Sequence, residues 1–548
     1  MSTEPTTTAP APGAADAPSD RPPSAGRAAA RNTAIFSVVT GLSRIAGLVR
    51  EIVASSYFAT SGAFSAFTIA FQVPNVVRSL FADAALGAAF VPVFTDLLEQ
   101  GRRKDAFRLA STLFFLIFTV LGAITVLFVA FAGLIMPLVI GSELAPVRDL
   151  TVGLTRVMFP VVLVLGLNGL VVGMLNAFDH FTIPALSPLV WNLVILVCLV
   201  GSHHVLSGEN QLYGYAVGIL IGTAVQFAMA APMLRRLGFR LEFSLSFRDE
   251  RVRQVLRLML PVTIGLGMIN FNELINSTLG SLVSPGAARA IDAAFRIYML
   301  PQGMFSVAIA TVLFPALSRF AARRDFDGLR ALTANGMRQI FLMLIPAAAA
   351  TLALATPITQ LIYQHGRFGP DSTELVSSAL FWFSFSLPFS GVNLLLTRTF
   401  FSLQKPWITT ALAGLNLSVN LLVSIALYKP FGIAGIVIGT GVSTATMTVA
   451  EIHFLRRELN GRLDGRRTAA VTAQITFASA LLAAAAYAVW YALHRALGEA
   501  LVSQLVEVGA ALAVGLAVYA IAVRTMGIPE AKQIERLVVG RLRRGNRR

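Results

Sequence analysis

Two apolar runs decide the fold of this chain: GLSRIAGLVREIVASSYF (residues 41–58) and FQVPNVVRSLFADAALGAAFVPVF (residues 71–94). They contain charged side chains where a membrane span normally has none: Arg44, Arg50, Glu51, Arg78 and Asp83. An arginine at the centre of a bilayer costs roughly 2.5–3.5 kcal/mol on insertion scales. We therefore predict that these arginines face a hydrated cavity and bind an anionic group.

The composition is that of an all-α polytopic membrane protein. The chain has 548 residues, of which 55% are hydrophobic and only 13% charged, and its mean hydropathy is +0.71. The net charge of +16 does not indicate a nucleic-acid partner, because the arginines gather between apolar spans, as the positive-inside rule predicts. The single cysteine, Cys198, excludes an intrachain disulfide and a CxxC-type metal site.

Stretches long enough to cross a bilayer recur along the chain. We predict about fourteen transmembrane helices, at 32–58, 63–94, 107–136, 152–177, 184–206, 211–232, 253–281, 290–318, 331–355, 372–397, 406–428, 431–455, 469–493 and 499–524. Residues 1–31 are rich in Ala, Pro, Thr and Ser and lack the pattern of a signal peptide, so we expect a disordered cytoplasmic tail.

The loop charges predict the topology. Arginines gather in alternate loops, at 102–103, 235–251, 319–330 and 456–467, and again in the C-terminal tail. The other loops are expected to hold only Arg148, Arg289, Arg367, Lys429 and Arg495. This asymmetry predicts an even number of spans with both termini in the cytoplasm.

An internal repeat predicts two lobes. The run VPNVVRSLFADAALGAAFVPVF from Val73 matches LPQGMFSVAIATVLFPAL from Leu300, and each copy has a proline near both ends. The expected organisation is an N-lobe, a basic cytoplasmic linker, a C-lobe, a C-terminal helix pair and a basic cytoplasmic tail, at 32–232, 233–252, 253–457, 458–525 and 526–548.

The second half contains its own intramembrane charges. Asp292 and Arg296 share a helix face, and Pro301 follows one turn later. We expect a bent or broken helix there, and likewise at Pro74, because broken helices beside charge line the binding cavities of transporters. Asn270 and Glu273 form a polar stripe that either binds a coupling ion or joins helices. Glu451 is expected at the membrane interface.

Enzyme motifs are missing from the sequence. There is no GxxxxGK[ST] phosphate loop, no HExxH and no GxSxG, and the six histidines fall at or near predicted loops or helix ends. We therefore expect no enzymatic activity, no cofactor and no metal site, and the identity of any coupling ion stays open.

Four segments carry a family resemblance: GLSRIAGLVRE (41–51), FQVPNVVRSLFADAALGAAFVPVF (71–94), GMLNAFDHFTIPALSP (173–188) and LPQGMFSVAIATVLFPALSRFA (300–321). The sequence resembles the MurJ (MviN) lipid II flippases of the multidrug/oligosaccharidyl-lipid/polysaccharide exporter superfamily. The resemblance implies fourteen transmembrane helices, with a C-terminal pair that forms a groove for the polyprenyl tail. It also implies transport of the undecaprenyl-pyrophosphate-linked peptidoglycan precursor to the outer leaflet of the bacterial cytoplasmic membrane.

The resemblance also implies the site residues. The substrate-binding arginines are Arg44, Arg50, Arg78 and Arg296, and the supporting acids are Glu51 and Asp83. We add Asp292 as a supporting acid because it lies one helical turn from Arg296. Three positions depart from the family pattern. Ser65 stands where an aspartate is common, and Phe295 and Met299 flank Arg296 where some relatives carry acids.

The expected partners are a lipid-linked anionic glycan, membrane lipids and cell-wall synthesis proteins. Two alternatives to this function stay open. One is a flippase for another lipid-linked glycan of the O-antigen or teichoic type. The other is a non-transporting scaffold for cell-wall enzymes.

Overall fold

The computed structural model describes residues 23–81, 84–243, 249–459, 461, 463–498 and 500–531, and all regular secondary structure in these ranges is helical. The first half contains α1 (Pro23–Phe58), α2 (Gly62–Phe81), α3 (Ala84–Glu99), α4 (Arg103–Val139), η1 (Ser142–Val147), α5 (Arg148–Met158), α6 (Val161–Ala177), α7 (Thr182–Val205) and α8 (Asn210–Arg236). The second half contains α9 (Glu250–Gly280), α10 (Ala287–Pro301), η2 (Gln302–Ser306), α11 (Val307–Ala322), α12 (Phe326–Ala353), α13 (Ala355–Tyr363), α14 (Pro370–Ser402), α15 (Pro406–Glu458), α16 (Gly465–Leu497) and α17 (Leu501–Thr525).

The all-α membrane fold is confirmed. Each predicted span falls on helix, and 11 helical stretches within the described ranges are long and apolar enough to cross a bilayer. One of them, α15, combines two predicted spans, 406–428 and 431–455, and bends at Gly432, which has a φ of 58°. A total of fourteen crossings stays a prediction.

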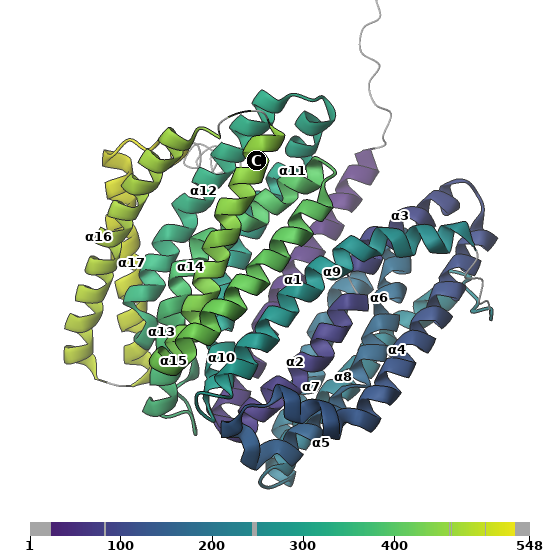
Figure 1. Ribbon diagram of the computed structural model, residues 1–548, viewed down its shortest axis with the longest axis horizontal. Coiled ribbons are helices and arrows are strands. Elements are labelled where there is room, and N and C mark those ends of the chain that lie inside the picture. Colours follow the sequence, from purple (N-terminus) through teal and green to yellow (C-terminus); the bar gives the residue numbers. More distant parts are fainter. Residues whose placement is uncertain are drawn as a thin grey trace, which may run out of the picture.

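The helices form two groups (Figure 1). Helices α2–α8 lie on one side and α10–α15 on the other, with α16 and α17 at the outer edge of the second group. Helix α9 connects the two groups, because Val252 and Val255 near its start pack into the core of the first, whereas Leu279 near its end packs into the core of the second. The last turns of α1, including Ala54 and Phe58, pack with α2, α5, α7 and α8.

The two predicted helix breaks had different outcomes. After Pro301 the α-helix changes to a π-helical turn, η2, before α11 begins. At Pro74 the helix does not break, because α2 continues through it from Gly62 to Phe81, and a bend there stays a prediction. A proline is tolerated inside a membrane span because groups on neighbouring helices can form hydrogen bonds with the backbone carbonyl that the proline leaves unpaired.

The two groups are joined at the C-terminal end of α1. The Arg367 amide donates to the Ser56 carbonyl oxygen at 2.8 Å, and the Thr60 and Ser372 hydroxyls lie 2.8 Å apart. Gly366, with a φ of +63°, allows this approach, since a Cβ there would lie 2.6 Å from the Ser56 oxygen. Figure 1 shows the start of α1 and the end of α17 both at the opposite end of the molecule, with the second helix group between them.

Candidate functional site

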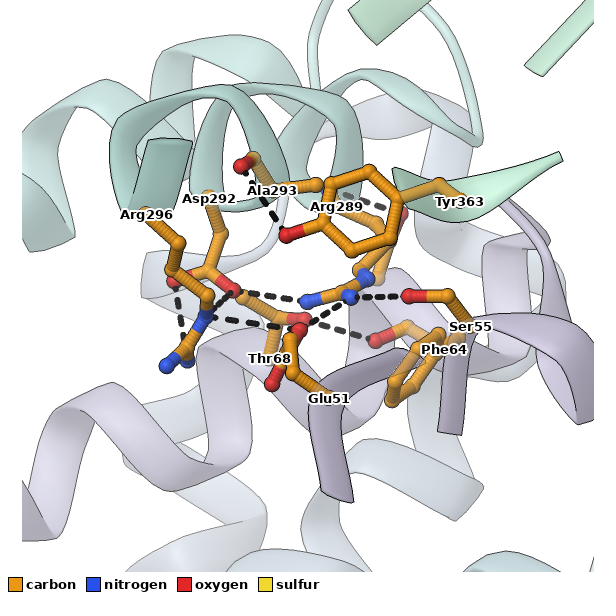
Figure 2. Close-up of polar contacts among 10 residues, drawn as sticks. Glu51, Ser55, Phe64, Thr68, Arg289, Asp292, Ala293, Arg296 and Tyr363 are labelled. Carbon is orange, nitrogen blue, oxygen red and sulfur yellow. Dashed lines mark hydrogen bonds and ion pairs between the residues drawn. The ribbon is translucent and has the colours of Figure 1, made fainter. Parts of the chain in front are cut away.

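Four charged side chains from two helices form a network where the groups meet (Figure 2). Glu51 comes from α1, whereas Arg289, Asp292 and Arg296 lie on one face of α10. Arg296 Nε is 3.4 Å from the Glu51 carboxylate and 3.0 Å from Asp292. Arg289 donates to Glu51 and, at 2.7 Å, to Asp292. Each of the two arginines therefore contacts both acids, and one acid belongs to the other helix group.

Arg289 is the residue that sequence reasoning missed. It was expected in an external loop, but α10 begins at Ala287, and only 1% of the arginine is exposed. Its Nη2 also donates to Ser55 at 2.8 Å, and its guanidinium lies 4.2 Å from the centre of the Phe64 ring. The signal was present in the sequence, because spacings of three and seven residues place Arg289, Asp292 and Arg296 on one helix face.

The network is balanced in charge. Two arginines face two carboxylates, and Glu51 is 4% exposed. Removing charges from water costs several kcal/mol per ion, and this cost is offset only where ion pairing and hydrogen bonds are well formed. The pairs therefore stabilise the arrangement in which α1 and α10 are in contact.

Arg50 lies beside the network with unused hydrogen-bonding capacity. Its guanidinium lies 5.0 Å from the centre of the Trp191 ring, and its buried Nε has no hydrogen-bond partner within the described part of the chain. Together with the network it lines a cavity of about 30 Å³, which also contacts Gln72 and Tyr215. A cavity of this size has room for about two water molecules.

A second cavity, of about 1120 Å³, lies among α9, α10, α14 and α15. Gln72 and Asp292 line both cavities, so the charge network borders the large one. The large cavity has mostly apolar walls with scattered polar groups, and two of its lining residues, Arg257 and Arg398, are cationic. Its volume is slightly above the range of about 300–1,000 Å³ that is usual for small-molecule sites.

The remaining predicted residues are spread over three places. Arg44 lies beside the π-helical turn, with Nη1 3.6 Å from where a Cβ on Gly303 would lie. Arg78 donates from Nε to Asn75 at 2.9 Å and lines neither cavity described above. Glu273 lines the large cavity, and Asn270 is half-buried on the same helix.

Asp83 lies outside the described residues. The sequence-based expectation for Glu451 was wrong, because this carboxyl is fully buried between α14 and α15, hydrogen-bonded to Thr397.

The departures from the family pattern have structural roles. Ser65 is buried and accepts a hydrogen bond from the Arg289 amide at 3.3 Å, so it contacts the network without adding charge. Phe295 packs on Tyr298 and lines the large cavity. Met299 is 48% exposed and faces away from the core.

A family model for the lipid II flippase MurJ matches residues 54–510. The chain belongs to this family. It is 30% identical over 414 residues to a probable lipid II flippase MurJ of Rhizobium meliloti, across 73% of this chain and 76% of the relative. A probable MurJ of Treponema pallidum is 28% identical, across 77% of this chain and 81% of the relative.

Solved structures share the fold. A lipid II flippase MurJ in an inward closed conformation superposes with a TM-score of 0.75 at 21% identity, covering 90% of this chain and 99% of that one. An inward-facing multidrug resistance MATE family transporter of the MOP superfamily has a TM-score of 0.65 at 14% identity, covering 78% of this chain and 98% of that one. This chain thus shares its fold with both solved proteins, and it is a multi-pass membrane protein of the MurJ family.

Proposed function

We propose that this chain flips lipid II from the inner to the outer leaflet of the bacterial cytoplasmic membrane by alternating access, with both termini in the cytoplasm. The observation that carries the proposal is the charge network with Arg50, which borders a cavity large enough for a polar head group. Membership of the MurJ family supports the choice of substrate.

The pyrophosphate of the substrate is the group that the arginines bind. A guanidinium binds phosphate oxygens through two parallel, charge-assisted hydrogen bonds, which an ammonium cannot reproduce. Arg50 has an unpartnered Nε, and Arg296 is 37% exposed in its side chain. These two arginines bind the pyrophosphate, while the sugars and peptide occupy the large cavity and the polyprenyl tail stays in the bilayer.

Binding and the change of conformation are linked by competition. Arg296 is already paired with Glu51 and Asp292, so pyrophosphate has to compete with these carboxylates. Once Arg296 turns to the substrate, α1 and α10 are joined by fewer ion pairs. The substrate therefore has a higher affinity for the state in which the lobes separate at this end, and this difference in affinity shifts the population.

The test is a flipping assay in proteoliposomes with three lipid-linked substrates: lipid II, an O-antigen precursor and a teichoic precursor. We expect transfer of lipid II by the wild type, loss of transfer in Arg296→Ala and partial recovery in Arg296→Lys. Arg367→Ala is the matched control, because Arg367 contacts α1 through its backbone amide, which donates to the Ser56 carbonyl oxygen.

Transfer of one of the other two precursors but not of lipid II would show that the other precursor, not lipid II, is the substrate. Transfer of none would contradict the function. Full transfer by Arg296→Ala at matched reconstitution would contradict the role of the arginine.

A further inference from the structure

The polar contact surface between α14 and α15 ends in a buried carboxyl that the proposed mechanism does not use. This surface, here called the seam, consists of Asn393 and Thr397 on α14 with Thr444, Thr448 and Glu451 on α15. Asn393 donates from Nδ2 to the Thr444 carbonyl oxygen at 3.1 Å, and the Thr448 hydroxyl donates to Asn393 Oδ1 at 2.5 Å. Thr397 donates to Glu451 Oε1 at 2.9 Å.

Glu451 differs from the rest of the seam because half of its carboxyl is unused. The residue is 0% exposed, and its Oε2 has no hydrogen-bond partner among the described residues. The side-chain polar atoms of the other four seam residues are satisfied or exposed to the cavity. An ionised carboxylate in this position would be a buried charge with a single hydrogen bond, which protein interiors do not tolerate without a counter-ion.

Among the residues that the structure describes, no counter-ion reaches Glu451. The charged side chains and histidines on the helices that pack against α15 and, apart from Glu451, on α15 itself are Glu250, Arg251, Arg253, Arg257 and Glu273 on α9, Arg289, Asp292 and Arg296 on α10, Asp371, Glu374 and Arg398 on α14, and Lys429, His453, Arg456, Arg457 and Glu458 on α15. Within the described ranges none of them forms an ion pair or hydrogen bond with Glu451. The guanidinium of Arg398 instead lies 5.7 Å from the centre of the Phe314 ring.

Protonation of Glu451 removes the uncompensated buried charge. A protonated carboxyl is neutral, and the hydrogen bond with Thr397 can then reverse, so that Oε1–H donates to the threonine hydroxyl, which is able both to donate and to accept. Thr397 and Asn393 also line the large cavity, so one side chain separates Glu451 from the space in which the head group is bound. Water in that cavity can therefore exchange a proton with the carboxyl through the threonine hydroxyl.

We propose that Glu451 is a proton-binding site that couples a proton to the transport cycle. The carboxyl is protonated in the conformation described here, in which α14 and α15 are closed around it. When the lobes rearrange and the cavity fills with water, the O–H bond breaks and the proton passes by way of the Thr397 hydroxyl to that water, leaving a carboxylate. The coupling to transport rests on the proposed flippase function, whereas the protonation itself does not.

Two measurements test the proposal on the full-length protein in lipid. The first is infrared difference spectroscopy over a pH series without substrate, comparing wild type with Glu451→Gln. We expect the wild type to have a carbonyl band of a protonated carboxylic acid that is lost in Glu451→Gln. The second is lipid II flipping in proteoliposomes over the same pH series. We expect the pH dependence of the wild-type rate to be lost in Glu451→Gln.

Two further variants keep the result unambiguous. Glu507→Gln is the matched control, because Glu507 is equally buried and also has an unpartnered oxygen, but it pairs with His494 at 3.1 Å and lies outside the cavity. We expect its flipping profile to match the wild type. If Glu451→Gln does not fold, Thr397→Val, which keeps the acid and removes its hydrogen bond, replaces it, and we expect a shifted pH profile.

The outcomes separate the two proposals. An unchanged carbonyl band in Glu451→Gln, or an unchanged pH profile in the folded variant while lipid II is still flipped, overturns the proton site and leaves the flippase function standing. A wild type that flips no lipid II contradicts the proposed function, and the infrared titration then still decides whether Glu451 binds a proton. A pH profile altered equally by Glu507→Gln would also overturn the assignment to Glu451.

Discussion

Arg289→Met is expected to weaken the closed arrangement of the two helix groups. The variant keeps much of the side-chain volume but removes the guanidinium that contacts Glu51, Ser55 and Asp292. Breaking a buried ion pair by removing one partner costs about 3–5 kcal/mol, because the other charge stays buried. Arg296 remains 3.4 Å from Glu51 and still partly compensates its charge, so we expect a cost at the lower end of this range, about 3 kcal/mol. At about 1.4 kcal/mol per factor of ten, the closed population falls about 100-fold relative to the open one.

The assay is cysteine labelling at the junction of the two groups. A cysteine replacing Ser372, which is 8% exposed and contacts Thr60, is treated with a membrane-impermeant thiol reagent in a Cys198→Ala background. We expect protection in the wild type and labelling about 100-fold faster in Arg289→Met, where each factor of ten corresponds to about 1.4 kcal/mol. Unchanged labelling at an unchanged melting temperature would refute the reasoning.

A second buried pair provides the matched control. Arg338 on α12 donates to Glu530 at 2.6 Å and joins the C-terminal segment to the second helix group, away from α1. Arg338→Met should lower the melting temperature by a comparable amount without exposing the cysteine at 372. Faster labelling in this control would mean that general destabilisation explains both results.

Three further predictions concern the same junction and site. Cysteines replacing Thr60 and Ser372, whose hydroxyls are 2.8 Å apart, should form a disulfide that stops transport until a reductant is added; transport by the oxidised protein would contradict lobe separation. Gly286→Ala places a Cβ against the Thr60 carbonyl oxygen, so the closed state should lose about 1–3 kcal/mol, read as faster labelling, whereas slower labelling would contradict the prediction. Arg50→Ala and Arg296→Ala should each fail to complement a strain depleted of its own flippase at matched expression and melting temperature, with partial rescue by lysine; full complementation would contradict a substrate-binding role.

The hydropathy and charge pattern of the sequence was sufficient to predict the class of fold. A membrane span has to bury an apolar run of fixed length, so the spans can be read locally, and all of the predicted ones fall on helix. The charges at Glu51, Asp292 and Arg296 were likewise visible, because their cost in lipid is a property of each residue alone.

Only the tertiary structure decided which of these charges meet. Arg289 stands at the edge of a span by hydropathy, and its burial depends on Glu51, which is 238 positions away in the sequence. Glu451 likewise lies near the end of a predicted span, and its burial depends on packing against α14. The sequence by itself determined that charge must be sheltered from lipid, since that cost is local. Which partner shelters it is set by packing between distant helices, and no local pattern contains that information.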